Sequence, residues 1–186
     1  MKKVVSVISI LVISLIMVGC SCMKTTAKGA VESFLDQYRN LSSSVITDMD
    51  EVVDKETELT EEQKGKYRDV LKKQYSDLKY EIIDESYDGD TAVVESKITV
   101  YDLYKVQKEA TEYLNDNPDE FNDENEQYDS VKFMDYKLEQ MKKNNDTVEY
   151  TIKFNLTKDE NGNWQVTEIS QDDLEKIHGI YNYESE

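Results

Sequence analysis

The sequence predicts a single α+β domain, and three observations support this class. Apolar residues recur every three or four positions in residues 26–41 and 60–76, which is the spacing of amphipathic helices. Residues 78–103 and 147–170 instead alternate between apolar and polar side chains, as strands do. Asp-Gly and Asn-Gly pairs interrupt these two segments and supply tight turns, so each segment predicts a β-hairpin.

Helices come first in the predicted order. The first helix, residues 26–41, places its apolar side chains on one stripe: Ala27, Ala30, Val31, Phe34, Leu35, Tyr38 and Leu41. A weaker helix spans residues 45–54. Thr60 and Gln63 have the spacing of a capping box, so the next strong helix runs over residues 60–76.

The first hairpin pairs residues 78–86 with residues 91–103. In the second, residues 147–157 alternate regularly, and residues 164–170 return after the Asn161-Gly162 turn. Ser170 then caps a terminal helix that we expect to run to about residue 177.

A helical insertion, residues 104–145, separates the two hairpins. Helical spacing is present in residues 104–114 and 125–143, and the acidic stretch at residues 115–127 is expected to form a loop. A one-faced antiparallel sheet must bury that face against another layer, and the N-terminal helices are its expected cover. One domain, residues 27–186, holds all these elements.

Two stretches resemble a known fold family. They are AKGAVESFLDQYRN (27–40) and TIKFNLTKDENGNWQVTEI (151–169). Their order, helices first and a hairpin last, resembles the NTF2-like cone fold, and more narrowly the small NTF2-like lipoproteins of Gram-positive bacteria. The resemblance implies a curved antiparallel sheet with the N-terminal helices packed on it. It does not imply a chemistry, because relatives use the cone for catalysis or binding, or fill it with side chains.

The N-terminus resembles the leader of a bacterial lipoprotein. Two lysines precede an apolar run at residues 4–18, which has the length of a signal-peptide core and is short for a membrane span. Residues 17–20, Met-Val-Gly-Cys, resemble a lipobox. We therefore expect a signal peptide at residues 1–19, a diacylglyceryl group on Cys20 and a tether over residues 20–26. An ordinary cleaved signal and an uncleaved signal anchor are the alternatives.

The charge of the predicted mature chain limits its partners. Removing residues 1–19 removes two lysines and leaves 20 basic against 40 acidic residues, a formal charge of −20. Such a surface repels nucleic acid and anionic lipid headgroups. The expected partners are the membrane, held through the lipid anchor, and a small ligand or an envelope protein.

Site residues follow from the implied cone. If it is hollow, its lining includes Phe34, Tyr38, Tyr80, Ile98, Tyr150, Phe154 and Trp164; otherwise these residues are core. We expect no catalytic constellation, cofactor or metal site. The domain holds no thiol, its single histidine, His178, is expected to be exposed near a frayed terminus, and the acidic loop lacks the glycine of an EF-hand.

Two functions are therefore carried forward. The first is a lipid-anchored, extracytoplasmic, non-catalytic module that binds a ligand or protein of the cell envelope. The alternative is a cone-fold enzyme that uses a buried acid, for which Asp36, Asp84 and the Tyr80 hydroxyl are candidates.

Overall fold

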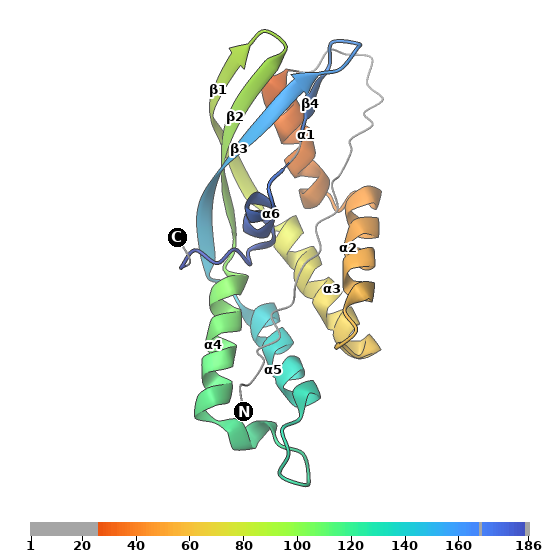
Figure 1. Cartoon of the computed structure of the whole chain (residues 1–186), viewed down its shortest axis with the longest axis vertical. Coiled ribbons are helices and arrows are strands. Elements are labelled where there is room, and N and C mark those ends of the chain that lie inside the picture. The colour runs from red at the N-terminus through yellow and green to blue at the C-terminus, as the bar shows by residue number, and fades with distance from the viewer. Residues whose placement is uncertain (1–25, 168, 185–186) are drawn as a thin grey trace.

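A computed structural model describes residues 26–167 and 169–184 (Figure 1). The predicted signal peptide, the predicted lipid attachment at Cys20 and all but the last residue of the predicted tether lie outside these residues. Within the described ranges the chain is α+β, with six α-helices and one open, antiparallel, four-stranded sheet.

The three N-terminal helices are confirmed. They are α1 (Ala27–Arg39), α2 (Ser43–Lys55) and α3 (Glu61–Ser76). At the start of α3 the predicted capping box is present, because the Thr60 side chain accepts from the Gln63 N–H and the Gln63 side chain accepts from the Thr60 N–H.

Both hairpins are also present, and the strands follow one another across the sheet in chain order. The strands are β1 (Lys79–Asp88), β2 (Thr91–Tyr101), β3 (Thr147–Lys158) and β4 (Trp164–Val166). The last strand is much shorter than the predicted residues 164–170. It pairs only with residues 156–158 of β3, after which the chain leaves the sheet toward the next helix.

One face of the sheet forms the core. Val94 and Ile98 of β2 and Phe154 of β3 are almost fully buried, and α1 contacts β1, β2 and β4 across this face. The opposite face is polar: Lys97 pairs with Glu149 at 3.0 Å, and Lys153 pairs with Glu95 at 2.8 Å. The predicted alternation is therefore confirmed as a half-buried sheet in β2 and β3, whereas β1 is exposed on both faces from Ile83 to Asp88.

The insertion extends away from the sheet as a helical hairpin with its own core (Figure 1). It consists of α4 (Leu103–Asp116), a 3₁₀ turn (Pro118–Phe121) and α5 (Ser130–Lys143), and α5 packs against α3. A second apolar cluster fills the hairpin, formed by Ala110, Leu114, Phe121 and Phe133 with Tyr113 and Tyr136 against them.

Aspartate caps set two boundaries that the periodicity misplaced. Asp102 accepts from the Lys105 N–H and starts α4, so β2 ends at Tyr101 rather than at residue 103. Asp129 accepts from the Val131 N–H, so α5 begins at Ser130 rather than at residue 125. In both places a local side-chain hydrogen bond outweighs the apolar pattern.

The prediction for His178 was wrong. It ends helix α6 (Gln171–His178) and is only 7% exposed, because the helix packs against α3 and β2. Its Nδ1 lies 2.8 Å from the Tyr75 hydroxyl oxygen, and the Tyr38 ring contacts both residues. Burial lowers the pKa of the imidazole to about 4, so the ring is neutral at physiological pH.

Gly179 locks the end of α6 against the base of the sheet. Its φ of +72° is left-handed, and a Cβ atom there would collide with the Tyr101 carbonyl oxygen and the Gln74 side chain. The Gly179 carbonyl accepts from the Tyr104 N–H at 2.8 Å. Gln74, 1% exposed, donates to the Ile177 carbonyl at 3.3 Å and accepts from the Tyr101 N–H at 3.1 Å. We call these contacts the base junction.

Replacing Gly179 with alanine should destabilise the fold by at least about 2 kcal/mol, because the left-handed backbone alone costs a side chain about 1–2 kcal/mol. The matched control is Gly65→Ala in α3, where no atom lies within 4 Å of the added Cβ. This change should stabilise the fold by about 0.5–1 kcal/mol. Urea unfolding measures both, and equal small effects would contradict the base junction.

His178 should make the fold sensitive to acid. Its folded pKa of about 4 lies below the ordinary 6.5, so between these values only the unfolded chain binds the proton. Stability is then fully present above pH 6.5 and falls by up to about 3 kcal/mol as the pH approaches 4. The carboxylates titrate in every variant, so the test compares wild type with His178→Gln. The wild type should lose more stability over this range, and parallel curves would show that His178 is not buried and neutral.

Candidate functional site

A groove of about 490 Å³ opens at the base of the sheet, beside the base junction. Four parts of the chain line it: the residue between β2 and α4, the start of β3, helix α6 and the C-terminal segment that follows α6. The lining residues are Asp102, residues 147–151, Lys176, Tyr181 and Tyr183.

Tyrosine rings form much of the groove. Tyr150 and Tyr181 meet edge to face, with centroids 5.8 Å apart, and Tyr183 meets Tyr104 in the same way at 5.0 Å. The Lys176 ammonium lies 4.9 Å from the centre of the Tyr181 ring and is paired with Asp173 at 3.1 Å. The groove therefore offers aromatic surface with a fixed cation at one side.

The Tyr150 hydroxyl is the unusual group in the groove. It is buried, and no hydrogen-bond partner for it is found among the residues that the structure describes. Burial, and then the negative charge of Asp102, raise the pKa of this hydroxyl, so it keeps its proton. Buried polar groups are almost always paired, so this hydroxyl marks a place where a ligand can complete a hydrogen bond once a small shift of the ring or its neighbours exposes it to the groove.

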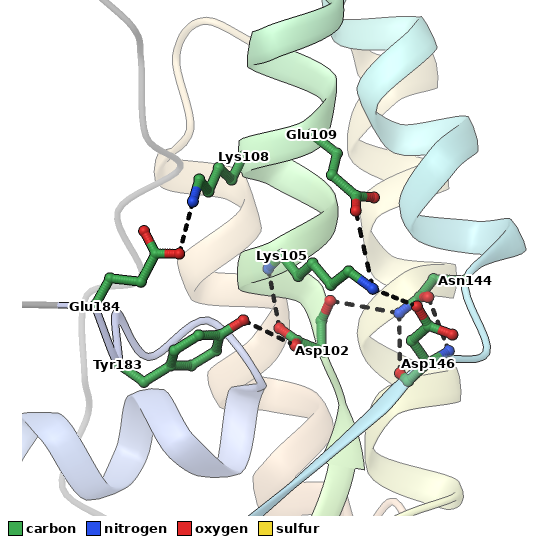
Figure 2. A network of polar contacts seen from close by, with 8 residues as sticks. All are labelled: Asp102, Lys105, Lys108, Glu109, Asn144, Asp146, Tyr183 and Glu184. Carbon is green, nitrogen blue, oxygen red and sulfur yellow. Dashed lines mark hydrogen bonds and ion pairs between the residues drawn. The ribbon is translucent and has the colours of Figure 1, made fainter.

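Asp102 forms hydrogen bonds to several of the segments around the groove (Figure 2). The residue is 7% exposed. Its carboxylate accepts from the Lys105 N–H at 2.9 Å and from the Tyr183 hydroxyl at 3.1 Å. Its carbonyl accepts from the Asn144 side chain at 3.4 Å, and its N–H donates to the Asp146 carbonyl at 2.9 Å. One residue thus joins α4, the start of β3 and the C-terminal segment.

Ion pairs surround this centre in the same view (Figure 2). Lys105 pairs with Asp146 at 2.8 Å, which joins the two ends of the insertion, and Lys108 pairs with Glu184 at 2.6 Å, which holds the C-terminal segment. These pairs are partly exposed, so each contributes little to stability by itself. Together they fix the segments that carry the groove's side chains.

A second, smaller groove of about 330 Å³ lies between α4 and α5. Tyr113 and Tyr136 stack at its side, with centroids 5.0 Å apart and planes 19° apart. These rings also cover the second apolar cluster, so this groove follows from the packing of the helical hairpin.

The predicted pocket residues divide between core and groove. Phe34, Tyr38, Ile98, Phe154 and Trp164 are each at most 9% exposed and belong to the main core. Tyr80 is half-buried, and its hydroxyl donates to Asp36 at 2.9 Å. Of the seven predicted residues, only Tyr150 also lines the groove at the base of the sheet.

Eight of the nine residues that line the groove were not predicted: Asp102, Thr147, Val148, Glu149, Thr151, Lys176, Tyr181 and Tyr183. The sequence did contain one indication of the two tyrosines: Tyr181 and Tyr183 are spaced two residues apart, shortly after Gly179, which ends a helix. Periodicity alone assigns such a terminal segment no partner. Its place beside β3 depends on the base junction, which is made by residues far apart in the sequence.

The acids named for catalysis lie elsewhere. The Asp36 side chain is 43% exposed and paired with Arg39 at 3.2 Å, and Asp84 is exposed on β1. Within residues 26–167 and 169–184, no group of three or more acidic, histidine or cysteine side chains is placed to hold a metal ion. In the same part of the chain, no helix is long and apolar enough to cross a membrane.

Comparison with known proteins gives one structural likeness. No family model and no curated protein sequence matches the chain. The crystal structure of YcdA from Bacillus subtilis, a candidate lipoprotein, is similar, with a TM-score of 0.51 and 16% sequence identity. The match covers 84% of this chain and 56% of that chain. At this identity the likeness concerns the fold alone.

Removing the unpaired hydroxyl should stabilise the protein. We expect Tyr150→Phe to raise the free energy of unfolding by about 1 kcal/mol, because a buried hydroxyl without a partner carries an uncompensated desolvation cost. The control is Tyr75→Phe, which removes a hydroxyl that is bonded to His178 and should cost about 1 kcal/mol. If both variants lose stability equally in urea unfolding, the Tyr150 hydroxyl is paired.

Proposed function

We propose that this protein is a lipid-anchored lipoprotein of the extracytoplasmic membrane face and acts as a non-catalytic binding module of the cell envelope. The observation that carries the binding role is the buried, unpaired Tyr150 hydroxyl in a tyrosine-lined groove. The groove is held in place by the base junction and by the contacts of Asp102, so it is formed before any ligand arrives.

The anchor is supported by the leader and by the likeness in fold. Residues 17–20 resemble a lipobox, and the similar protein YcdA is itself a candidate lipoprotein. Two acyl chains suffice for stable attachment, since each buried methylene contributes about 0.8 kcal/mol. We further propose that the domain is a variant of the NTF2-like cone, in which α1 covers the sheet and core side chains fill the space between them.

A binding role fits the groove better than the enzymatic alternative does. A cone-fold enzyme needs a buried acid that faces the substrate, and Asp36 and Asp84 lie at the surface. Asp102 does reach the groove, but its carboxylate already caps α4 and accepts the Tyr183 hydroxyl. The formal charge of −20 after removal of the leader disfavours nucleic acid as the partner.

Metabolic labelling with palmitate tests the anchor. The wild type and Cys22→Ala should incorporate the label and remain with the membrane, whereas Cys20→Ala should incorporate none. Equal labelling of the Cys20→Ala and wild-type proteins would contradict lipid attachment at this residue.

Two-dimensional NMR with a library of wall fragments and short peptides tests the binding role. A ligand should shift the signals of Tyr150 and Tyr181, and Tyr150→Phe should weaken its binding. A library that leaves the groove signals unmoved, or that shifts only the smaller groove between α4 and α5, would contradict the proposal.

A further inference from the structure

We infer that the free edge of β3 captures an extended segment of a partner protein, which adds a strand to the sheet and places a lysine or arginine side chain in the tyrosine-lined groove. This inference rests on the proposed binding function and names the chemical class of its partner. It follows from the pairing of β3, the position of the groove and the charge of the groove.

The first half of β3 is paired on one side only. On one side β2 pairs with β3 along its length, from Thr147 to Thr157. On the other side β4 pairs only with residues 156–158, and Thr167 adds one more bond, to the Asn155 carbonyl. In Figure 1 the start of β3, drawn in teal, accordingly lies at the margin of the sheet.

The hydrogen bonds also show which main-chain groups point outward. In an antiparallel strand, the N–H and C=O of alternate residues point to the same side. Asp146 and Lys158 are bonded toward the β2 side, whereas Asn155 is bonded toward β4. By this alternation Glu149, Thr151 and Lys153 direct their N–H and C=O groups to the free edge. No main-chain partner for these groups is found among the described residues.

The groove lies along this edge, because residues 147–151 line it. The Glu149 side chain is held on the polar face of the sheet by Lys97, at 3.0 Å. Glu149 therefore faces the groove with its main chain. The main-chain N–H and C=O groups of Glu149 and Thr151 thus lie beside the Tyr150 ring. An incoming strand that pairs with them would bring one of its side chains over the groove, as in other cases of β-strand addition.

The groove favours a cationic side chain. The Asp102 carboxyl group belongs to an almost fully buried residue, and the two groups that donate to it, the Lys105 N–H and the Tyr183 hydroxyl, are neutral. The Lys105 ammonium interacts with Asp102 only at longer range, because it is paired with Asp146. The positive charge of Lys176 is already balanced by Asp173. Tyrosine faces attract cations, and Lys176 occupies such a position on Tyr181. The strongly acidic surface adds long-range attraction for a basic segment.

The test uses the lipidated protein purified in detergent, with synthetic peptides as probes. The main probe is acetyl-Thr-Val-Lys-Val-Thr-amide. One control replaces its lysine with glutamate, and a second carries N-methyl groups on alternate amides so that it cannot pair as a strand. Butylamine, a small cation without a peptide backbone, is the third.

Amide hydrogen exchange of the protein is the readout. The lysine peptide should slow exchange at Glu149, Thr151 and Lys153 at least tenfold and leave Tyr150 and Ile152 unchanged, because these two already face β2. The glutamate and N-methyl peptides should bind at least tenfold more weakly.

Proline variants of the protein locate the pairing edge. Thr151→Pro removes one outward N–H and should weaken binding of the lysine peptide at least tenfold, since proline is tolerated at strand edges but cannot donate. The matched control is Glu85→Pro on β1. Asn155 is bonded toward β4, so Val93, which lies opposite it on β2, directs its main-chain groups toward Ser86 on β1. Ser86 is therefore bonded to β2, and its neighbour Glu85 faces outward on the opposite edge of the sheet. This control should bind as the wild type does.

Three outcomes would overturn the inference. They are no protection at the β3 edge with any peptide, protection that the N-methyl peptide gives equally, and butylamine binding as tight as that of the lysine peptide. The last outcome would leave the proposed binding function standing, with a small amine in place of a strand. Failure of every probe to reach the groove, together with an unresponsive NMR library, would remove the proposed function as well.

Discussion

The base junction is the constraint on which the lower half of the molecule depends. At Gly179 the main chain passes so close to the Tyr101 carbonyl that no side chain fits, and the left-handed turn there ends α6. Gln74 satisfies one main-chain group on each side of this contact, Ile177 and Tyr101, from within the core. A buried amide in this role cannot be replaced by an apolar side chain without leaving both groups unpaired. The direction of the C-terminal segment, and with it one side of the groove, follows from this contact.

Two apolar clusters pack the described part of the molecule, and the groove lies beside the larger one. The main core joins the sheet to α1, α2, α3 and α6 and also includes side chains of α4 and α5, such as Val106 and Leu138, whereas the second cluster fills the rest of the insertion. Polar side chains join the two, with Asp102, Asn144 and Asp146 at the ends of β2 and α5 (Figure 2). The groove lies beside the main core, against which Tyr150 packs, and none of its lining residues belongs to the second cluster. The unpaired, buried Tyr150 hydroxyl is a local cost of the kind that proteins keep at functional sites.

The elements followed closely from the sequence, whereas the site did not. Helices such as residues 60–76 have a strong stripe and a capping box, and both hairpins have glycine turns, so their signals are local and were correct. The boundaries at Asp102 and Asp129 were missed because one capping hydrogen bond outweighs an apolar pattern. The burial of His178 was predicted wrongly, and Tyr181 was missed as a groove residue, for another reason. Their burial depends on Gln74 and Tyr75, about a hundred positions away, and no periodicity reports such a contact. Tyr150 was among the predicted pocket residues because it lies on a regular strand, and it also lines the groove.

The most direct test of this view is the exchange rate of the Tyr104 amide, which donates to Gly179, whereas the Gln74 side chain bonds to Ile177 and Tyr101. If the base junction positions the C-terminal segment, replacing Gln74 with leucine should speed exchange at Tyr104 at least about tenfold through local opening. The amide of Leu138 in α5, which packs in the main core away from the junction, should keep its protection in the same sample. An unchanged rate at Tyr104 in a folded Gln74→Leu protein would show that the C-terminal segment is held by other contacts and that the groove does not depend on this junction.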